Sequence, residues 1–137
     1  MAALDVIGML QAFQQLERSV SVSLMYSGLR IPQFRLLDKL DEMQSATVTE
    51  LSRVLKVTRA TASVAVNELI RSGVVVVEEN AEDRRSFHIH LSELGRNKLN
   101  VARSDLAVLC SKLSQRYSAE MIEVLNRFAR GKWADPA

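Results

Sequence analysis

The stretch VTRATASVAVNELIRSG, from Val57 to Gly73, determines how the rest of this 137-residue chain is interpreted. It predicts a short helix that begins after Thr58, whose hydroxyl caps free backbone N–H groups, and ends at Gly73. Apolar residues at helical spacing predict one narrow buried face: Ala62, Ala65, Val66, Leu69 and Ile70. The outward face is small and polar: Arg59, Ala60, Thr61, Ser63, Val64 and Asn67. Such a face fits a DNA major groove, but it is equally typical of an ordinary amphipathic helix.

A second short helix is predicted directly before this stretch. Thr47 and Glu50 have the spacing of a capping box, in which each side chain binds the other residue's backbone N–H. Three apolar residues would bury this helix: Leu51, Val54 and Leu55. Two short helices joined by about three or four residues are the sequence form of a helix-turn-helix.

The pattern changes after Gly73. Val74–Val77 is β-branched and too short for a helix, and Phe87–Leu91 alternates apolar and polar residues, so both segments are predicted strands. The polar residues between them, Glu78–Ser86, would form a charged tip. Two strands and a charged tip directly after a helix-turn-helix make a wing. The wing favours DNA binding over the ordinary amphipathic helix.

Long amphipathic helices are predicted on both sides of this middle segment. Apolar residues step by three and four from Val6 onward, and Gly28 is expected to end that first helix. Pro32 suits the first turn of the next helix. After the wing, Ser92 caps a long helix and Ser118 caps a last one. The first helix has more apolar surface than a small domain needs, which favours burial against a second chain over packing wholly within its own chain.

The composition is that of one globular domain, with 47% hydrophobic and 25% charged residues. No apolar run approaches the roughly 18 residues of a membrane span, and no signal peptide is apparent, so we expect a cytoplasmic protein without membrane contact. The net charge of +2 is unevenly distributed: residues 1–46 carry −1, residues 47–92 zero and residues 93–137 +3. A neutral middle segment argues against strong nonspecific affinity for DNA.

The order of elements, together with particular residues, resembles the MarR (multiple antibiotic resistance regulator) family of winged-helix repressors. The matching segments are Pro32–Leu37, Glu50–Ser52, Leu69 with Gly73, Asp83–Arg85 and Leu91–Gly95. The resemblance spans nearly the whole chain.

The resemblance implies a mainly α fold with a small β-wing (α+β), in a single domain of residues 1–137. A winged helix-turn-helix lobe at 31–92 would bind DNA, between dimerisation helices at 1–30 and 93–137. The protein would be a homodimeric transcription regulator, most often a repressor, that binds a pseudo-palindromic operator in double-stranded DNA. Arg84 or Arg85 would enter a narrow minor groove, and Asp83 would orient an arginine through a charge-assisted pair.

The resemblance also implies a cleft for a small aromatic effector that releases the DNA. It would lie where the first two helices meet, near Tyr26, Arg30 and Phe34. The same three residues would serve equally well as ordinary packing at that junction.

The chain departs from the family pattern at positions that often hold basic residues. Val64 occupies one of them in the predicted recognition helix, and Val76–Glu79 occupies others in the first wing strand. Both departures remove candidate phosphate contacts, although Val64 could instead contact a thymine methyl group. They leave open a second function, a winged-helix protein with weakened DNA binding that acts as a protein-interaction module.

Catalytic patterns are not apparent in the sequence, so we expect neither enzyme activity nor a cofactor. His88 and His90 lie two apart on one strand and would point the same way, but no carboxylate or cysteine pattern completes a metal site. Cys110, the single cysteine, lies on the apolar stripe of the long helix, where a thiol is commonly unreactive. A thiol-based redox-sensing regulator remains a further alternative.

Overall fold

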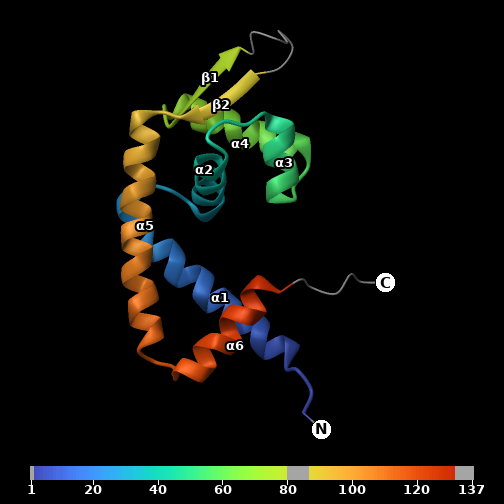
Figure 1. Ribbon diagram of the computed structural model, residues 1–137, viewed down its shortest axis with the longest axis vertical. Helices are drawn as coiled ribbons and strands as arrows, with labels where there is room; N and C mark the ends of the chain where they lie inside the picture. Colours follow the sequence, from blue (N-terminus) through green and yellow to red (C-terminus); the bar gives the residue numbers. More distant parts are fainter. Residues whose placement is uncertain (1, 80–86, 132–137) are drawn as a thin grey trace.

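The computed structural model describes residues 2–79 and 87–131. Its elements are α1 (Val6–Ser23), the 3-10 helix η1 (Met25–Ser27), α2 (Ile31–Met43), α3 (Val48–Leu55), α4 (Arg59–Arg71), β1 (Val75–Glu79), β2 (Phe87–Leu91), α5 (Glu93–Ser114) and α6 (Ala119–Arg130). The fold is mostly helical with one small antiparallel sheet, which confirms the predicted class. In Figure 1, α2, α3, α4 and the sheet gather at one end, while α1 and α6 cross at the other. The long helix α5 connects the two ends along one side (Figure 1).

The core lies in the end that contains the helix-turn-helix. Its largest fully buried side chains come from α2, α3, α4, β2 and α5 and from the segments that join them: Leu24, Leu36, Leu37, Leu40, Leu51, Leu69, Val74, Ile89 and Leu99. Ile89 also ties the sheet to the segment before α3, because its backbone exchanges hydrogen bonds of 2.8 and 3.0 Å with Ala46. The α3–α4 pair therefore shares one core with the sheet and two further helices.

The two strands pair in antiparallel register, with Val75 opposite Leu91 and Glu79 opposite Phe87. The first strand is shifted relative to the prediction, because β1 begins at Val75 and includes Glu79. Val74 lies outside the strand and is buried, and its N–H donates to the Leu69 carbonyl at 3.1 Å. It therefore serves as the link from α4 to the sheet.

The predicted helix ends differ in detail from those observed. α1 ends at Ser23, and Gly28, with φ 75°, closes η1 instead of α1. α2 begins at Ile31 with Pro32 in its first turn, and the Arg30 N–H donates to the Gln33 Oε1 at 3.0 Å. An amide side chain thus satisfies a backbone group at this end, which lacks a hydroxyl cap.

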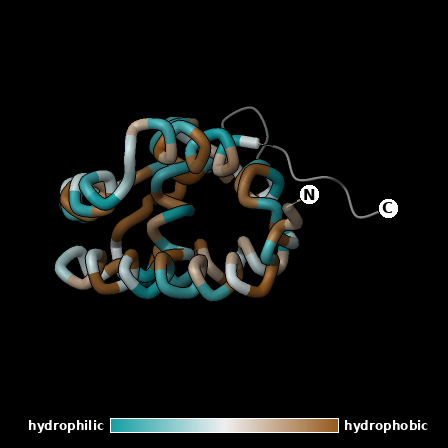
Figure 2. Tube along the Cα trace, turned by 90° about the horizontal axis from the view of Figure 1, so that it is seen from below, coloured by the Kyte–Doolittle hydropathy of each residue, from teal (hydrophilic) through white to brown (hydrophobic). Residues whose placement is uncertain are grey.

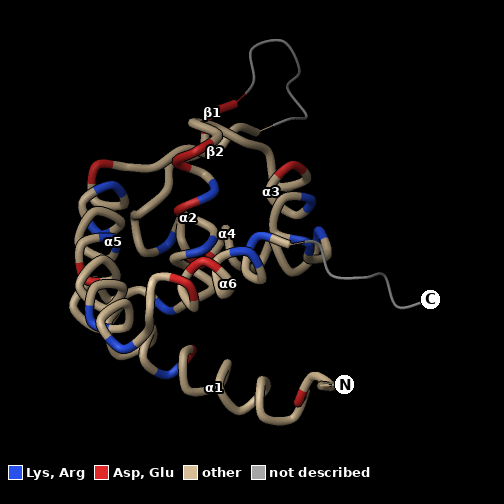
Figure 3. Tube along the Cα trace, turned by 60° about the horizontal axis from the view of Figure 1, so that its bottom comes forward, with Lys and Arg blue, Asp and Glu red and all other residues tan. Residues whose placement is uncertain are grey.

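Neither α1 nor α6 contains a buried residue. The two helices meet at Phe13 and Phe128, whose stacked rings have centroids 5.9 Å apart. Hydrophobic and hydrophilic residues alternate along the helical turns (Figure 2), and most of the length of α1 is free of charged residues (Figure 3). Exposed large apolar residues on the two helices are Val6, Ile7, Leu10, Phe13, Leu16, Val22, Met121, Val124 and Leu125. We call this set the α1/α6 apolar face.

A cluster of ion pairs joins α5 to α2. Arg103 Nη2 lies 2.8 Å from Asp38 Oδ1, Arg103 Nη1 lies 2.8 Å from Asp41 Oδ2, and Arg96 Nη1 lies 3.0 Å from Asp41 Oδ1. The hydrogen bond that Arg103 donates to Asp41 lowers the pKa of Asp41, and the hydrogen bonds that Arg103 donates to Asp38 raise the pKa of Arg103. These pairs hold the long helix against the winged end of the molecule.

Candidate nucleic-acid interface

The candidate recognition helix α4 begins as the sequence predicts. Thr58 is its N-cap, with extended backbone angles (φ −68°, ψ 155°), and its Oγ1 accepts from the Thr61 N–H at 3.1 Å. The same hydroxyl donates to the Thr61 Oγ1 at 2.9 Å. Two bonds from one side chain fix the first turn of the helix.

The inner face of α4 is narrower than predicted. Ala62, Val66 and Leu69 are buried and Ala65 is half-buried, whereas Ile70 is exposed. Ile70 lies at the edge of the stripe, so it reaches solvent when the three central residues pack.

The outer face of α4 contains five of the six residues predicted to read DNA. Arg59, Ala60, Thr61, Val64 and Asn67 are exposed. Ser63 is half-buried, because it lies beside the buried stripe instead of opposite it. The face is thus accessible to a partner, and the role of each residue stays a prediction.

Local hydrogen bonds define both ends of α3. The Thr47 N–H donates to the Glu50 Oε1 at 3.1 Å and the Glu50 N–H to the Thr47 Oγ1 at 3.1 Å, which is the predicted capping box. These bonds lower the pKa of Glu50 and keep it ionised. Lys56 adopts the left-handed conformation (φ 58°, ψ 44°), and the Val57 N–H donates to the Ser52 carbonyl at 3.0 Å.

The base of the wing is described, but its tip is not. Asp83, Arg84 and Arg85 lie outside the described residues, so their predicted roles are untested. At the base, Glu78 lies opposite His88 in the register and its Oε1 is 3.8 Å from the Nε2 of His90. In the described part of the chain, no three acidic, cysteine or histidine side chains form a group suited to a metal ion.

One contact of α4 was not foreseen from the sequence. Arg30, at the N-cap of α2, donates from Nη2 to the Glu68 Oε2 at 3.2 Å, and both side chains are largely solvent-exposed. Glu68 lies on the exposed side of α4, beside the candidate DNA-contact residues. The positive charge of Arg30 therefore offsets the negative charge of Glu68 at this surface. The two residues are 38 positions apart, and no local pattern links them.

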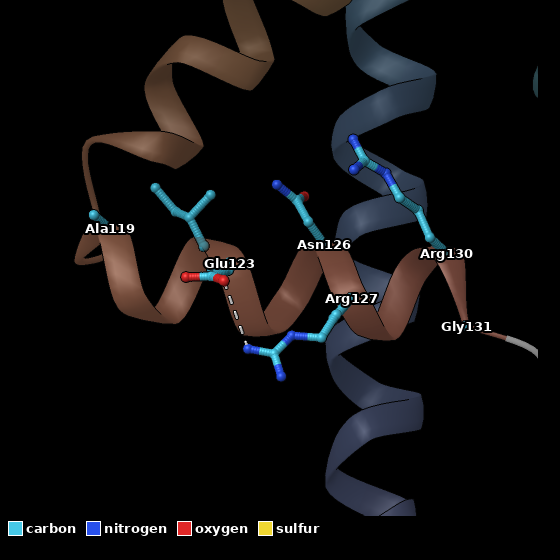
Figure 4. Close-up of a pocket in the computed structure, with 7 residues that line it drawn as sticks. Ala119, Glu123, Asn126, Arg127, Arg130 and Gly131 are labelled. Atoms are coloured by element: carbon cyan, nitrogen blue, oxygen red, sulfur yellow. Dashed lines mark ion pairs between the residues drawn. The ribbon is translucent and has the colours of Figure 1, made fainter.

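The three predicted effector residues have different surroundings. Tyr26 is 95% exposed, Arg30 pairs with Glu68, and Phe34 is half-buried and packs against the core. An open pocket of about 700 Å³ lies along α6 instead, lined by Ala119, Ile122, Glu123, Asn126, Arg127, Arg130 and Gly131 (Figure 4). None of the three predicted residues lines that pocket, so a cleft at the α1–α2 junction remains a prediction.

Cys110 differs in its surroundings from the sequence expectation. It is exposed in the single chain, although the stripe beside it includes the buried Leu99 and Ala102 and the half-buried Leu106. The buried part of α5 is its N-terminal half, and Cys110 lies beyond it. Among the described residues, no helix has the length and apolar character needed to cross a membrane.

Several solved structures have the same fold as this chain. A MarR family transcription regulator matches with a TM-score of 0.83 at 20% identity, over 90% of this chain and 82% of that one. A mutant MarR from E. coli complexed with operator DNA matches with a TM-score of 0.80 at 20% identity, over 92% of each chain. Streptococcus pneumoniae FabT in complex with DNA gives 0.77 at 22% identity, over 88% and 87%. No curated protein sequence matches this chain.

The capped α3–α4 pair and the two-stranded sheet that follows it define a winged helix-turn-helix protein. Residues 27–86, which span this unit from η1 into the wing, match the sequence model described as MarR family. The winged helix-turn-helix of this chain is thus similar to that of the MarR family, and its fold is that of the solved MarR-family structures.

Proposed function

We propose that this protein is a homodimeric, sequence-specific DNA-binding regulator that represses transcription from a pseudo-palindromic operator and is released by a small-molecule effector. Residues 31–92 would form the DNA-binding lobe, and residues 1–30 and 93–137 would form the dimerisation helices. The observation that carries the proposal is the α1/α6 apolar face. It occurs in a chain whose winged end presents an exposed, well-capped helix.

The α1/α6 apolar face supports the dimer. Its residues come from the two chain ends, and α1 and α6 contribute no buried residue within a single chain. A large contiguous apolar surface on a globular protein marks an interaction site, because leaving it in water is unfavourable. A second copy supplies an identical face, and a two-fold axis lets each face cover the other.

The dimer in turn supports the choice of operator. A two-fold axis relates two copies of α4, and such helices read half-sites about one helical turn apart in successive major grooves. The exposed residues of α4 would contact bases, and Arg84 and Arg85 would contact the minor groove. The DNA-bound relatives have the same fold, and their complexes are the reason to choose duplex DNA as the partner.

Release by an effector follows from the same geometry. A ligand shifts the protein away from DNA only when it binds the two dimer geometries with different affinity. The junction near Tyr26, Arg30 and Phe34 is the predicted place for a small aromatic molecule. There Arg30 joins the start of α2 to Glu68 on α4, so a ligand at Arg30 would act directly on the recognition helix.

The direct test is selection of bound sequences from random duplexes, followed by gel shift on the enriched site at low and physiological salt. We expect one pseudo-palindromic motif, bound by a dimer. Arg84→Ala and Arg85→Ala should each reduce the salt slope by about one unit per lost phosphate contact. Glu82→Ala in the same tip serves as the control, because it removes no cation. Unchanged affinity and slope in both arginine variants would remove the wing from the interface.

A second candidate is a protein-interaction module with weakened DNA binding. It rests on the neutral 47–92 segment and on Glu78 and Glu79, which the structure places in the wing strand β1. Carboxylates at that position repel the phosphate backbone. Failure to enrich any duplex sequence at low salt, with the dimer intact, would favour this function over the first.

A further inference from the structure

An apolar side chain lies in the middle of the exposed face of α4. Val64 is 61% exposed, and it follows Ala60 by four residues and precedes Asn67 by three. Side chains at these spacings form one row along a helix. Valine is a poorer helix former than alanine, and burial within this chain accounts for little of its surface. The position is therefore suited to contact with something outside the chain.

The neighbours of Val64 offer few hydrogen-bond donors to a base. Ala60 has none in its side chain. The Thr61 Oγ1 accepts from the Thr58 hydroxyl at 2.9 Å, which leaves the single O–H of Thr61 as a donor. Glu68, one turn further along, accepts from Arg30 at 3.2 Å. A base edge opposite Ala60 and Val64 would therefore contact only the methyl groups of these two side chains.

The major groove displays one apolar group on its base edges, the C5-methyl of thymine. Guanine or cytosine opposite Val64 would lose water from an acceptor or a donor without gaining a hydrogen bond in return. Asn67, next in the row, has the amide that pairs bidentately with adenine. The row thus combines a methyl-binding group and an adenine-binding group on successive turns.

We infer that Val64, with Ala60, recognises thymine methyl groups, and that each operator half-site carries A·T pairs opposite the first two turns of α4. This inference rests on the proposed DNA-binding function and specifies how its recognition helix selects sequence. Val64 is a specificity-determining residue, and its contribution is apolar contact instead of phosphate binding.

The test uses the site that wild-type protein selects from random duplexes. Each thymine of the half-site is replaced in turn by deoxyuridine, which removes the methyl group and leaves the hydrogen-bonding groups unchanged. At one position per half-site, we expect wild type to lose about fourfold in affinity, the equivalent of one buried methyl group. Substitution in both half-sites should cost about sixteenfold, because the dimer uses both contacts.

Val64→Ala should bind the unmodified site more weakly and should respond no further to deoxyuridine at that position. Alanine favours helix, so the variant is expected to fold, and circular dichroism checks this. Val101→Ala is the matched control: Val101 is 44% exposed on α5, and its variant should retain the wild-type response.

The outcomes separate the two proposals. If wild type selects no sequence, the DNA-binding function itself fails. If wild type selects a site but no deoxyuridine substitution weakens its binding more than that of Val64→Ala, the function stands and methyl recognition by Val64 is wrong. If Val64→Ala does not fold, a wild-type protein that loses no affinity with any deoxyuridine substitution still overturns the inference.

Discussion

Gly95 allows the start of α5 to pack closely against the segment that precedes β1. It lies in the first turn of α5, where its N–H donates to the Ser92 Oγ at 3.0 Å, and the Ser92 N–H donates to the Val74 carbonyl at 3.1 Å. A Cβ at position 95 would overlap that same Val74 carbonyl, which is backbone and cannot move aside alone. The residue is glycine because α5 and the link to β1 approach this closely.

Gly95→Ala is therefore expected to destabilise the protein. Alanine would favour the helix by about 1 kcal/mol at most, whereas forcing extra volume into a packed site costs about 1–3 kcal/mol and more when backbone must shift. Urea unfolding followed by circular dichroism measures the net loss. Asn97→Ala, at an exposed position of the same helix, should change stability by less than about 0.5 kcal/mol. Equal stability of both variants would contradict the close approach.

The ion pairs between α2 and α5 give stability a defined dependence on pH. The pKa of Asp41 is lowered in the folded protein, chiefly by its hydrogen bond from Arg103. Its contribution is therefore fully present above the unfolded pKa, near 3.8, and is lost as the pH falls through the folded pKa. We expect a flat unfolding free energy near neutrality and a decline below about pH 4.

Arg103→Gln should reduce both the stability at pH 7 and the steepness of that acid decline. The loss at pH 7 should be about 1 kcal/mol, a modest value because the pairs are partly solvated. Lys39→Gln removes an exposed pair with Glu42 on the same helix and should have almost no effect. Titration of unfolding free energy between pH 3 and 7 checks this, and parallel curves for wild type and Arg103→Gln would contradict it.

Single residues also mark the limit of what the sequence could predict. The cap residues follow from spacing, because their partners lie three positions away. The Arg30–Glu68 and Arg103–Asp38 pairs bridge 38 and 65 positions, so they depend on the tertiary fold. The exposure of Ile70 has the same origin, since periodicity gives the centre of a helix face but packing sets its width.

At the scale of elements, helix starts were predicted well because they are local. Hydroxyl caps at Thr47, Thr58, Ser92 and Ser118 all accept the expected backbone N–H groups. The bounds of strand β1 were predicted less well. Residues 74–77 are all valine, so the sequence does not show where the strand begins, and pairing with β2 sets the register of β1. The candidate recognition helix and strand β2 thus follow from the sequence, whereas the bounds of β1 needed the structure. Asp83, Arg84 and Arg85 of the predicted tip lie outside the described residues.

Thr58→Ala should weaken the start of the candidate recognition helix α4. It removes the acceptor for the Thr61 N–H, at a cost of about 1 kcal/mol in unfolding free energy. DNA affinity should fall further than stability alone explains, because the frayed turn carries the predicted contacts Arg59 and Ala60. Thr58→Ser keeps the hydroxyl and should restore both quantities. Failure of serine to restore them would show that the threonine methyl group, and not the cap, is required.

At the scale of the whole molecule, the α1/α6 apolar face is the feature on which the proposed dimer depends. The sequence indicated excess apolar surface in the first helix. The structure locates it on α1 together with α6, and 95 residues separate the two helices in the sequence. Their meeting at Phe13 and Phe128 could not be derived from periodicity, because each helix alone is an ordinary amphipathic pattern.

Leu10→Glu should convert the proposed dimer to monomer. Leu10 is 57% exposed in the single chain, so a charge costs little there, but burial of that charge against a second copy is strongly unfavourable. Sedimentation or light scattering measures the mass. Gln15→Glu introduces the same charge elsewhere on α1 and should leave the dimer intact. A monomeric wild-type protein, or a dimeric Leu10→Glu protein, would contradict the α1/α6 interface.

The long helix α5 has a mechanical consequence. Its 22 residues correspond to a rod of about 33 Å, which Arg96 and Arg103 hold to α2 between its first turn and its midpoint and which is followed by α6. A tilt of about 5° at the α6 end would move the N-terminal end of α5 through about 3 Å, nearly the rise of one base pair. In the proposed DNA-bound dimer, a small rotation of α5 at its α6 end would therefore displace the winged end by nearly one base-pair step.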